Sequence, residues 1–138
     1  MKKYFYLILL LLFVLPALGE EHFISTPTKL YEKDYNTYWC EAREGRLEAT
    51  TIDGSRVDCL LPNYAVEGER AYKWKEAVGQ SLFYGIQTQR TPAILLIVND
   101  PVKDKKYIDR LNKVATRSGI KTWYITPAEL ASHGIGKY

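Results

Sequence analysis

Apolar residues recur along the chain with two different periods, and the change of period separates the expected helices from the expected strands. A period of three to four residues indicates a helix that buries one face. It occurs in three stretches, residues 27–44, 69–86 and 104–118. A period of two, or a short continuous aliphatic run, indicates a strand. Such runs occur at residues 46–52, 55–61, 64–67, 93–98 and 120–125.

Turn and capping residues mark the ends of these elements. Thr26 can cap the first helix, and Pro27 fits its first turn. Asp53-Gly54 is a strong turn dipeptide, so the first two strands are expected to form a hairpin. Thr126 precedes a short terminal helix. The order α-β-β-β-α-β-α-β predicts a single α/β domain with a mixed central sheet.

The expected helix at residues 69–86 has two unlike faces. One face is apolar or small and is predicted to pack on the sheet; it consists of Trp74, Ala77, Val78, Ser81, Leu82 and Gly85. The opposite face is polar, because its residues recur at steps of three and four; it consists of Glu69, Lys73, Glu76, Gln80 and Tyr84. The polar face is therefore free to contribute side chains to a site.

Composition and charge narrow the class of protein. The chain has 138 residues, of which 46% are hydrophobic and 25% are charged, as is typical of a globular protein of one domain. From residue 20 onward, 17 basic residues stand against 16 acidic ones. A chain so close to neutrality is not a polybasic binder of nucleic acid or of anionic membranes. Any such binding has to come from a local patch.

Residues 1–19 have the pattern of a secretory signal peptide. A basic Lys2-Lys3 start precedes an apolar stretch of about a dozen residues, and small residues lead to Gly19. We expect cleavage after Gly19 and an exported domain at residues 20–138, periplasmic or extracellular, without stable membrane association. The alternative is an uncleaved membrane anchor, although the stretch is shorter than the ~20 residues that span a bilayer.

The cysteines agree with export. Cys40 and Cys59 are the only two, and an even number in an oxidising compartment favours a disulfide. Its Cα atoms should then lie roughly 4.4–6.8 Å apart. The alternatives are two buried thiols, or half of a metal site that His22 and His133 would have to complete from near the chain ends.

Two carboxylates and a polar helix face suggest phosphodiester chemistry. Asp58 lies late in the second strand, and Glu67 ends the third. Neighbouring strands are about 5 Å apart, so these carboxylates can hold a divalent cation between them. Lys73 and Gln80 on the following helix could then orient a water and a phosphate. The alternative is that these side chains are solvated surface charges.

The same residues carry a resemblance to a known family. The pattern is Asp58, then Glu67-Gly68-Glu69, then Lys73-Trp74-x-Glu76-Ala77-Val78-Gly79-Gln80-x-x-x-Tyr84. It resembles the PD-(D/E)XK nuclease superfamily, and the likeness runs from the first helix through the strand at 93–98. The Gln-x-x-x-Tyr part is similar to a helix motif of RecB-like members. The resemblance implies a restriction-endonuclease-like fold.

The resemblance also implies roles for these residues. Asp58 and Glu67 match the carboxylates that bind Mg²⁺ (or Mn²⁺). The family's Lys is expected two positions after Glu67, where this chain has Glu69. Lys73, one helical turn onward, could supply the ammonium instead, as in members whose Lys has moved to the helix.

By the same resemblance, Gln80 and Tyr84 would contact the nucleic acid, DNA in preference to RNA. Asp58, Glu67, Lys73 and Gln80 together would form the catalytic set. The sequence thus predicts an exported metal-dependent nuclease-like protein. If Lys73 does not reach the carboxylates, the alternative is a non-catalytic exported α/β module that keeps the fold for binding nucleic acid or protein.

Overall fold

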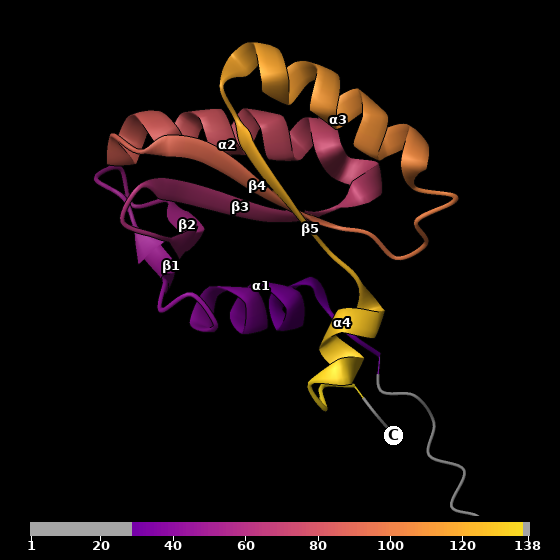
Figure 1. The fold of residues 1–138 in the computed structure, drawn as a ribbon. Coiled ribbons are helices and arrows are strands. Elements are labelled where there is room, and N and C mark those ends of the chain that lie inside the picture. The colour runs from indigo at the N-terminus through magenta and orange to yellow at the C-terminus, as the bar shows by residue number, and fades with distance from the viewer. Residues whose placement is uncertain (1–28, 137–138) are drawn as a thin grey trace, which may run out of the picture.

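The structure is a computed structural model that describes residues 29–136. A five-stranded sheet lies between two helical layers, with α1 and α4 on one face and α2 and α3 on the other (Figure 1). The elements in chain order are α1 Glu32–Glu41, β1 Arg46–Thr50, β2 Arg56–Leu60, β3 Tyr64–Arg70, the 3₁₀ turn η1 Ala71–Lys73, α2 Trp74–Thr88, β4 Thr91–Ile97, α3 Lys105–Ser118, β5 Lys121–Ile125 and α4 Pro127–Ser132.

The sheet mixes antiparallel and parallel pairing. Its strands lie in the order β1-β2-β3-β4-β5. β2 is antiparallel to both β1 and β3, whereas β3, β4 and β5 run parallel to one another. Parallel neighbours need a crossover connection, and α2 and α3 provide the two crossovers on one face of the sheet. The predicted α/β class with a mixed central sheet is confirmed.

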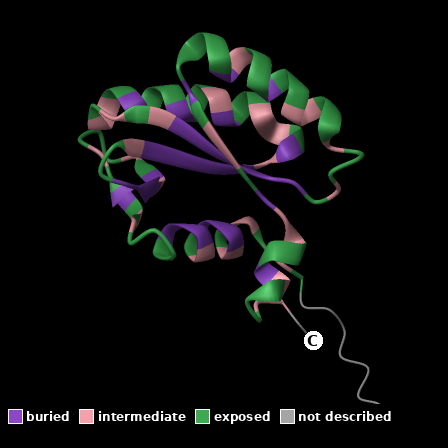
Figure 2. Cartoon of the chain, in the orientation of Figure 1, coloured by how far each residue is buried: buried purple, intermediate pink, exposed green. Residues whose placement is uncertain are grey.

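Strand β4 separates two apolar cores, which explains its unbroken aliphatic sequence. Leu95 and Ile97 belong to the core under α1 and α4, and Ile94 and Leu96 belong to the core under α2 and α3. All four are at most 1% exposed. Figure 2 shows the corresponding buried stretch through the middle of the sheet. A strand covered on both faces cannot alternate apolar with polar residues.

The third strand is longer than its pattern predicted. β3 runs to Arg70 instead of ending at Glu67. Its parallel partner holds the added residues in the sheet, and Glu69 lies opposite Leu96 of β4. The prediction that Glu69 opens the helix is therefore wrong, because α2 begins only at Trp74.

The buried face of α2 also differs from the prediction. Its buried residues are Ala77, Ser81, Tyr84 and Gly85. Leu82, predicted to be in the core, is 36% exposed, whereas Tyr84, predicted on the polar face, is 8% exposed. Small side chains let the helix approach the sheet closely, and a Cβ at Gly85 would lie 3.1 Å from Pro92. Close approach, rather than apolar character, selects this face.

The first helix is shorter than predicted at both ends. Thr26 and Pro27 lie outside the described residues, but residues 29–31 are not helical, and α1 begins only at Glu32 with Tyr31 at its N-cap, so the prediction of a helix that includes Leu30 and Tyr31 is wrong. Near residue 32 the carboxylate of Asp34 accepts a hydrogen bond of 2.7 Å from the backbone N–H of Tyr31. The helix ends at Glu41, and the chain then turns so that Gly45 meets the disulfide. A Cβ at Gly45 would lie 2.6 Å from both sulfur atoms, so this approach requires glycine.

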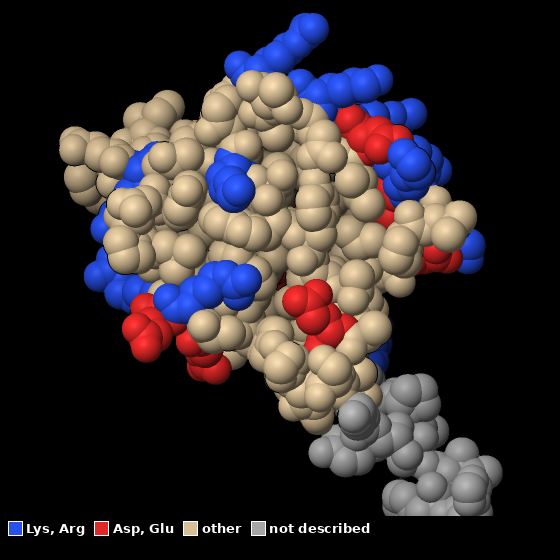
Figure 3. All heavy atoms as spheres, viewed as in Figure 1, with Lys and Arg blue, Asp and Glu red and all other residues tan. Residues whose placement is uncertain are grey.

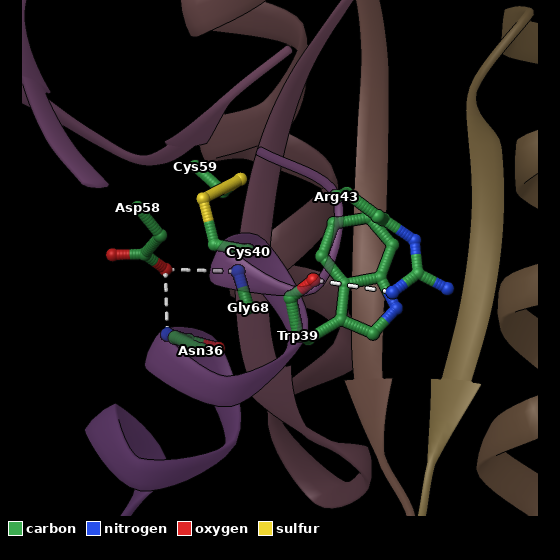
Figure 4. The surroundings of a disulfide bond; sticks show 7 residues. All are labelled: Asn36, Trp39, Cys40, Arg43, Asp58, Cys59 and Gly68. Atoms are coloured by element: carbon green, nitrogen blue, oxygen red, sulfur yellow. Dashed lines mark hydrogen bonds between the residues drawn. A yellow bond between two sulfur atoms is a disulfide. The ribbon is translucent and has the colours of Figure 1, made fainter. Parts of the chain in front are cut away.

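The predicted disulfide is confirmed. Cys40 of α1 and Cys59 of β2 are bonded, with Cα atoms 5.7 Å apart (Figure 4). This result excludes the two alternatives of free thiols and a thiolate metal site. The expected signal peptide at residues 1–19 lies outside the described part of the chain. Within residues 29–136, no helix has the length and apolar character needed to cross a membrane.

Candidate functional site

Asp58 is held by hydrogen bonds from two other elements. Its Oδ2 accepts from the backbone N–H of Gly68 in β3, at 2.8 Å, and from Nδ2 of Asn36 in α1, at 3.1 Å. Figure 4 shows the second carboxylate oxygen pointing away from both donors. The neighbouring Cys59 is bonded to α1, so the strand that carries Asp58 is fixed on both sides. One oxygen is thus positioned and the other remains available to a ligand.

Asn36 packs directly against Gly68, and this contact leaves no room for a side chain at position 68. A Cβ at Gly68 would lie only 1.8 Å from Oδ1 of Asn36. Asn36 is 8% exposed, and among the described residues its Oδ1 has no hydrogen-bond partner. The side chain therefore loses hydration on one atom while its amide nitrogen holds Asp58. Asn36 is a positioning residue for that carboxylate.

Two further carboxyl groups lie on β3. Glu67 and Glu69 are 6% and 5% exposed, and a spacing of two places them on the same side of the strand. Burial, as the largest cause, and then the charges of Asp58 and Glu69 together raise the pKa of Glu67 to about 9. At neutral pH the Glu67 carboxyl therefore holds a proton in the absence of a cation.

Residues from α1 and β1 complete the group. Burial, together with a hydrogen bond shared with Glu69, raises the pKa of Glu32 to about 7. Glu48 lies in β1 between residues paired with Val57 and Cys59, which places it opposite Asp58. The pKa of Asp58 is raised to about 6: burial is the largest cause, the charges of Glu48 and Glu69 act in the same direction, and the hydrogen bond from the Gly68 N–H opposes them.

These side chains come from four elements, and we call them the acidic cluster: Glu32, Glu48, Asp58, Glu67 and Glu69. A hollow of about 370 Å³ opens beside the cluster and is lined by Glu32, Asn36, Glu48 and Asp58, among others. Carboxylate and amide oxygens are the donors that Mg²⁺ and Mn²⁺ prefer. Within residues 29–136, no three Asp, Glu, His or Cys side chains are already arranged around one point as a metal cage.

Lys73 lies at the rim of the acidic cluster. Its Nζ is 3.6 Å from Oε2 of Glu69 and 3.8 Å from Oε2 of Glu76. The charges of Glu69 and Glu76, in that order, raise the pKa of the Lys73 ammonium. Lys73 thus stays protonated, and through Glu69 it joins the group that contains the two predicted carboxylates.

The remaining predicted residues, Tyr84 and Gln80, have different positions. Tyr84 packs with Val57 and Ala65 on the face of the sheet that α2 covers. Burial raises the pKa of its phenol, and the nearby charges of Glu67 and Asp58 add to the shift. Gln80, one turn earlier in α2, is exposed, and in the described part of the chain no hydrogen bond ties it to the cluster. The structure therefore associates Tyr84 with the carboxylates and leaves Gln80 outside them.

Three members of this neighbourhood were not expected from the sequence. Glu32 and Asn36 are four residues apart, a spacing that places them on one face of a helix, and that signal was available. Glu48 had no such signal, because the pairing of β1 with β2 brings it opposite Asp58.

The candidate site thus consists of a partly buried acidic cluster, in which Glu48 is exposed, with a hollow beside it, a positioning amide and one lysine at the rim. It lies where β2, β3 and the first residues of α1 meet. Comparison of the chain with protein-family models, with curated proteins and with solved structures finds no match.

Proposed function

We propose that this protein is an exported, divalent-metal-dependent nuclease-like enzyme that hydrolyses phosphodiester bonds of nucleic acid, DNA in preference to RNA. The observation that carries the proposal is the burial of Glu67 and Asp58 near further carboxyl groups, one of which, Glu69, pairs with Lys73. The α-β-β-β-α-β order around these residues is the one expected of a restriction-endonuclease-like fold.

Without a bound cation, the acidic cluster lowers the stability of the fold. Buried carboxyl groups that face one another raise each other's pKa and oppose ionisation. Residues that serve only stability would not be selected for such an arrangement, whereas groups of this kind are common at functional sites. A divalent cation would displace the protons and compensate the negative charges.

The donor set suits Mg²⁺ or Mn²⁺. Magnesium is usually held by one or two carboxylates, and waters and substrate phosphates complete its octahedron. Asp58 and Glu67 would be the protein ligands, so a cage of three or more side chains is not required. When bound, the ion would supply positive charge to the scissile phosphate and its attacking water.

The residues around the ion site have separable roles in this proposal. Asn36 and the Gly68 N–H keep Asp58 in one orientation. Glu69 and Glu76 keep Lys73 charged, so the lysine acts as a hydrogen-bond donor to a phosphate oxygen and not as a base. Tyr84 fills the apolar core on the α2 side of β2 and β3.

The decisive experiment combines a metal titration with a cleavage assay on the purified, oxidised protein. Labelled DNA is incubated with Mg²⁺ or Mn²⁺, and binding of each ion is followed by calorimetry. Asp58→Asn should lose cation binding and lower cleavage at least about 100-fold, because an amide lacks the charge that offsets dehydration of the ion. Glu129→Gln is the matched control: the same chemical change at an exposed residue of α4 should alter neither measurement.

Lys73→Ala separates the roles within the site. It should spare cation binding and lower only the cleavage rate. Full activity in Lys73→Ala, or unchanged cation affinity in Asp58→Asn, would contradict the proposed mechanism.

The non-catalytic module remains a second candidate because of one specific observation. Glu69 occupies the position expected for the family's Lys, and Lys73 is engaged by two acids. DNA binding by the wild-type protein without cleavage in Mg²⁺ or Mn²⁺ would favour this alternative.

A further inference from the structure

The outer face of α3 carries a row of basic side chains. Lys106, Arg110, Lys113 and Arg117 recur at steps of three and four residues, and all four are exposed. At 1.5 Å per residue the row is about 16 Å long. In Figure 3, Lys and Arg side chains project from the top of the molecule, where α3 lies. We call these four residues the basic face of α3.

The acids near the basic face are engaged elsewhere. Asp109 pairs with Lys105 at 2.7 Å, and Asp100 pairs with Lys103 at 3.4 Å. In the described part of the chain, no ion pair involves a residue of the basic face. Residues 103–121 contain seven basic and two acidic side chains, so their net charge of +5 exceeds that of the chain from residue 20 onward. Positive charge is thus concentrated on α3, and the remainder is net negative.

The sheet topology relates the basic face to the acidic cluster. β4 runs parallel to β3, and Glu69 lies opposite Leu96 near the C-terminal end of β4. Helix α3 follows β4, so its first turn, with Lys106, starts from the same end of the sheet that carries Glu67 and Glu69. A polyanion lying along α3 would therefore approach the end of the sheet where the acidic cluster lies.

The surroundings of the basic face are polar. The other exposed residues of α3 are Lys105, Asp109, Asn112, Thr116 and Ser118, and none of them is apolar. The apolar side of the helix is used by the core, since Leu111 and Ala115 are at most 4% exposed. A helix that inserts into a membrane surface needs an exposed apolar face, and α3 has none to spare.

We propose that the basic face of α3 binds the phosphate backbone of a nucleic acid, as a surface separate from the acidic cluster. This inference rests on the proposed function, in which the same polymer is cleaved at the cluster. Lys and Arg side chains that neutralise phosphates position a nucleic acid without selecting its sequence. Binding should therefore be general and sensitive to salt.

The test measures binding of a fluorescent DNA duplex by anisotropy, without divalent metal and at several salt concentrations. The charge reversal R110E/K113E removes the centre of the basic face. K29E/R46E is the matched control, because it changes the net charge equally at two exposed residues outside α3. R110E/K113E should weaken binding at low salt about tenfold or more. The slope of log K against log salt should fall by about 0.9 per lost phosphate contact.

Several results would overturn the proposal. Equal weakening in both variants would mean that only net charge matters, and unchanged binding in R110E/K113E would mean that the face is not used. If R110E/K113E instead loses binding only to vesicles rich in phosphatidylglycerol, the face belongs to an anionic membrane.

Cleavage assays on the same samples distinguish this inference from the proposed function. DNA binding that depends on the basic face, in a protein that never cleaves, supports the inference and contradicts the function. Cleavage by a protein whose R110E/K113E variant binds normally supports the function and contradicts the inference.

Discussion

The acidic cluster and the basic face of α3 carry charges of opposite sign and are built in different ways. The cluster draws on α1, β1, β2 and β3, and the disulfide and the hydrogen bonds of Asp58 fix its position. Burial is the main cause that raises the pKa of Glu32, Asp58 and Glu67, and the charges of neighbouring carboxyl groups act in the same direction. The basic face comes from one helix, is exposed, and costs the fold little. The positions of the carboxylates thus depend on tertiary contacts between several elements, whereas the basic face depends only on one helix and its period.

Removing the disulfide should have the largest effect on stability. The bond closes a loop across a sequence separation of 19, which contributes about 3 kcal/mol in the chain-entropy model. We expect Cys40→Ala/Cys59→Ala to lower the free energy of unfolding by about that amount in urea titrations. A reductant should destabilise the wild type similarly and leave the double variant unchanged. A loss well below 1 kcal/mol would mean that the disulfide does not support the cluster side of the molecule.

The second-largest effect is expected from pH, because the stability of the folded protein should depend on the protonation of Glu67. The raised pKa of Glu67, about 9 against an ordinary 4.5, means that the folded state binds its proton more tightly than the unfolded state. Stability contributed by this proton is complete below about pH 4.5 and is lost as pH rises toward 9. Glu67→Gln keeps a neutral side chain at every pH, so it should be more stable than the wild type at pH 9, and the difference should shrink steadily as the pH falls.

The same series of urea titrations at pH 5, 7 and 9 provides the control. At pH 5 Glu67→Gln and the wild type should differ little. Glu129→Gln, at an exposed residue, should follow the wild type throughout. Parallel curves for Glu67→Gln and the wild type would contradict the raised pKa.

A pair of glycine substitutions tests the packing beneath Asp58. Gly68→Ala would force a Cβ against Asn36, so we expect a loss of about 2 kcal/mol, typical of overpacking. Gly79→Ala meets nothing within 4 Å on exposed α2 and should instead stabilise by about 0.5–1 kcal/mol. Adding Asn36→Ala should relieve most of the clash in Gly68→Ala. Equal effects of the two glycine substitutions would mean that Asn36 is not packed as described.

The smallest effect on stability is expected from removing an exposed ion pair on α3. Lys105 and Asp109 form a short ion pair, but their side chains are 70% and 52% exposed. Exposed pairs contribute about 0.2–1 kcal/mol, because water screens them and both side chains lose freedom. A double-mutant cycle with Lys105→Ala and Asp109→Ala should give a coupling energy in this range, falling with added salt. A larger, salt-independent coupling would remove the contrast between the two regions.

Several features of the fold could be predicted from short stretches of sequence, because each depends on a single local property of the residues. Six consecutive aliphatic residues at 93–98 predicted a strand buried on both faces, and β4 is that strand. Asp53-Gly54 predicted the turn between β1 and β2. The disulfide could be predicted because the chain has only two cysteines, which can pair only with each other. The roles of the predicted site residues stay predictions, although the structure associates four of them, Asp58, Glu67, Lys73 and Tyr84, with one acidic cluster.

The sequence by itself determined the α/β class, the disulfide and the presence of carboxylates on two adjacent strands. Tertiary structure alone decided that β3 continues to Arg70, because its pairing with β4 supplies the hydrogen bonds that the local pattern did not reveal. It likewise decided that Asn36 meets Asp58, 22 residues away, and that Tyr84 and not Leu82 is buried. Local periodicity specifies which residues share a face of one element. Which elements then meet depends on packing between segments far apart in the chain, where small residues such as Gly68 and Gly85 permit close approach.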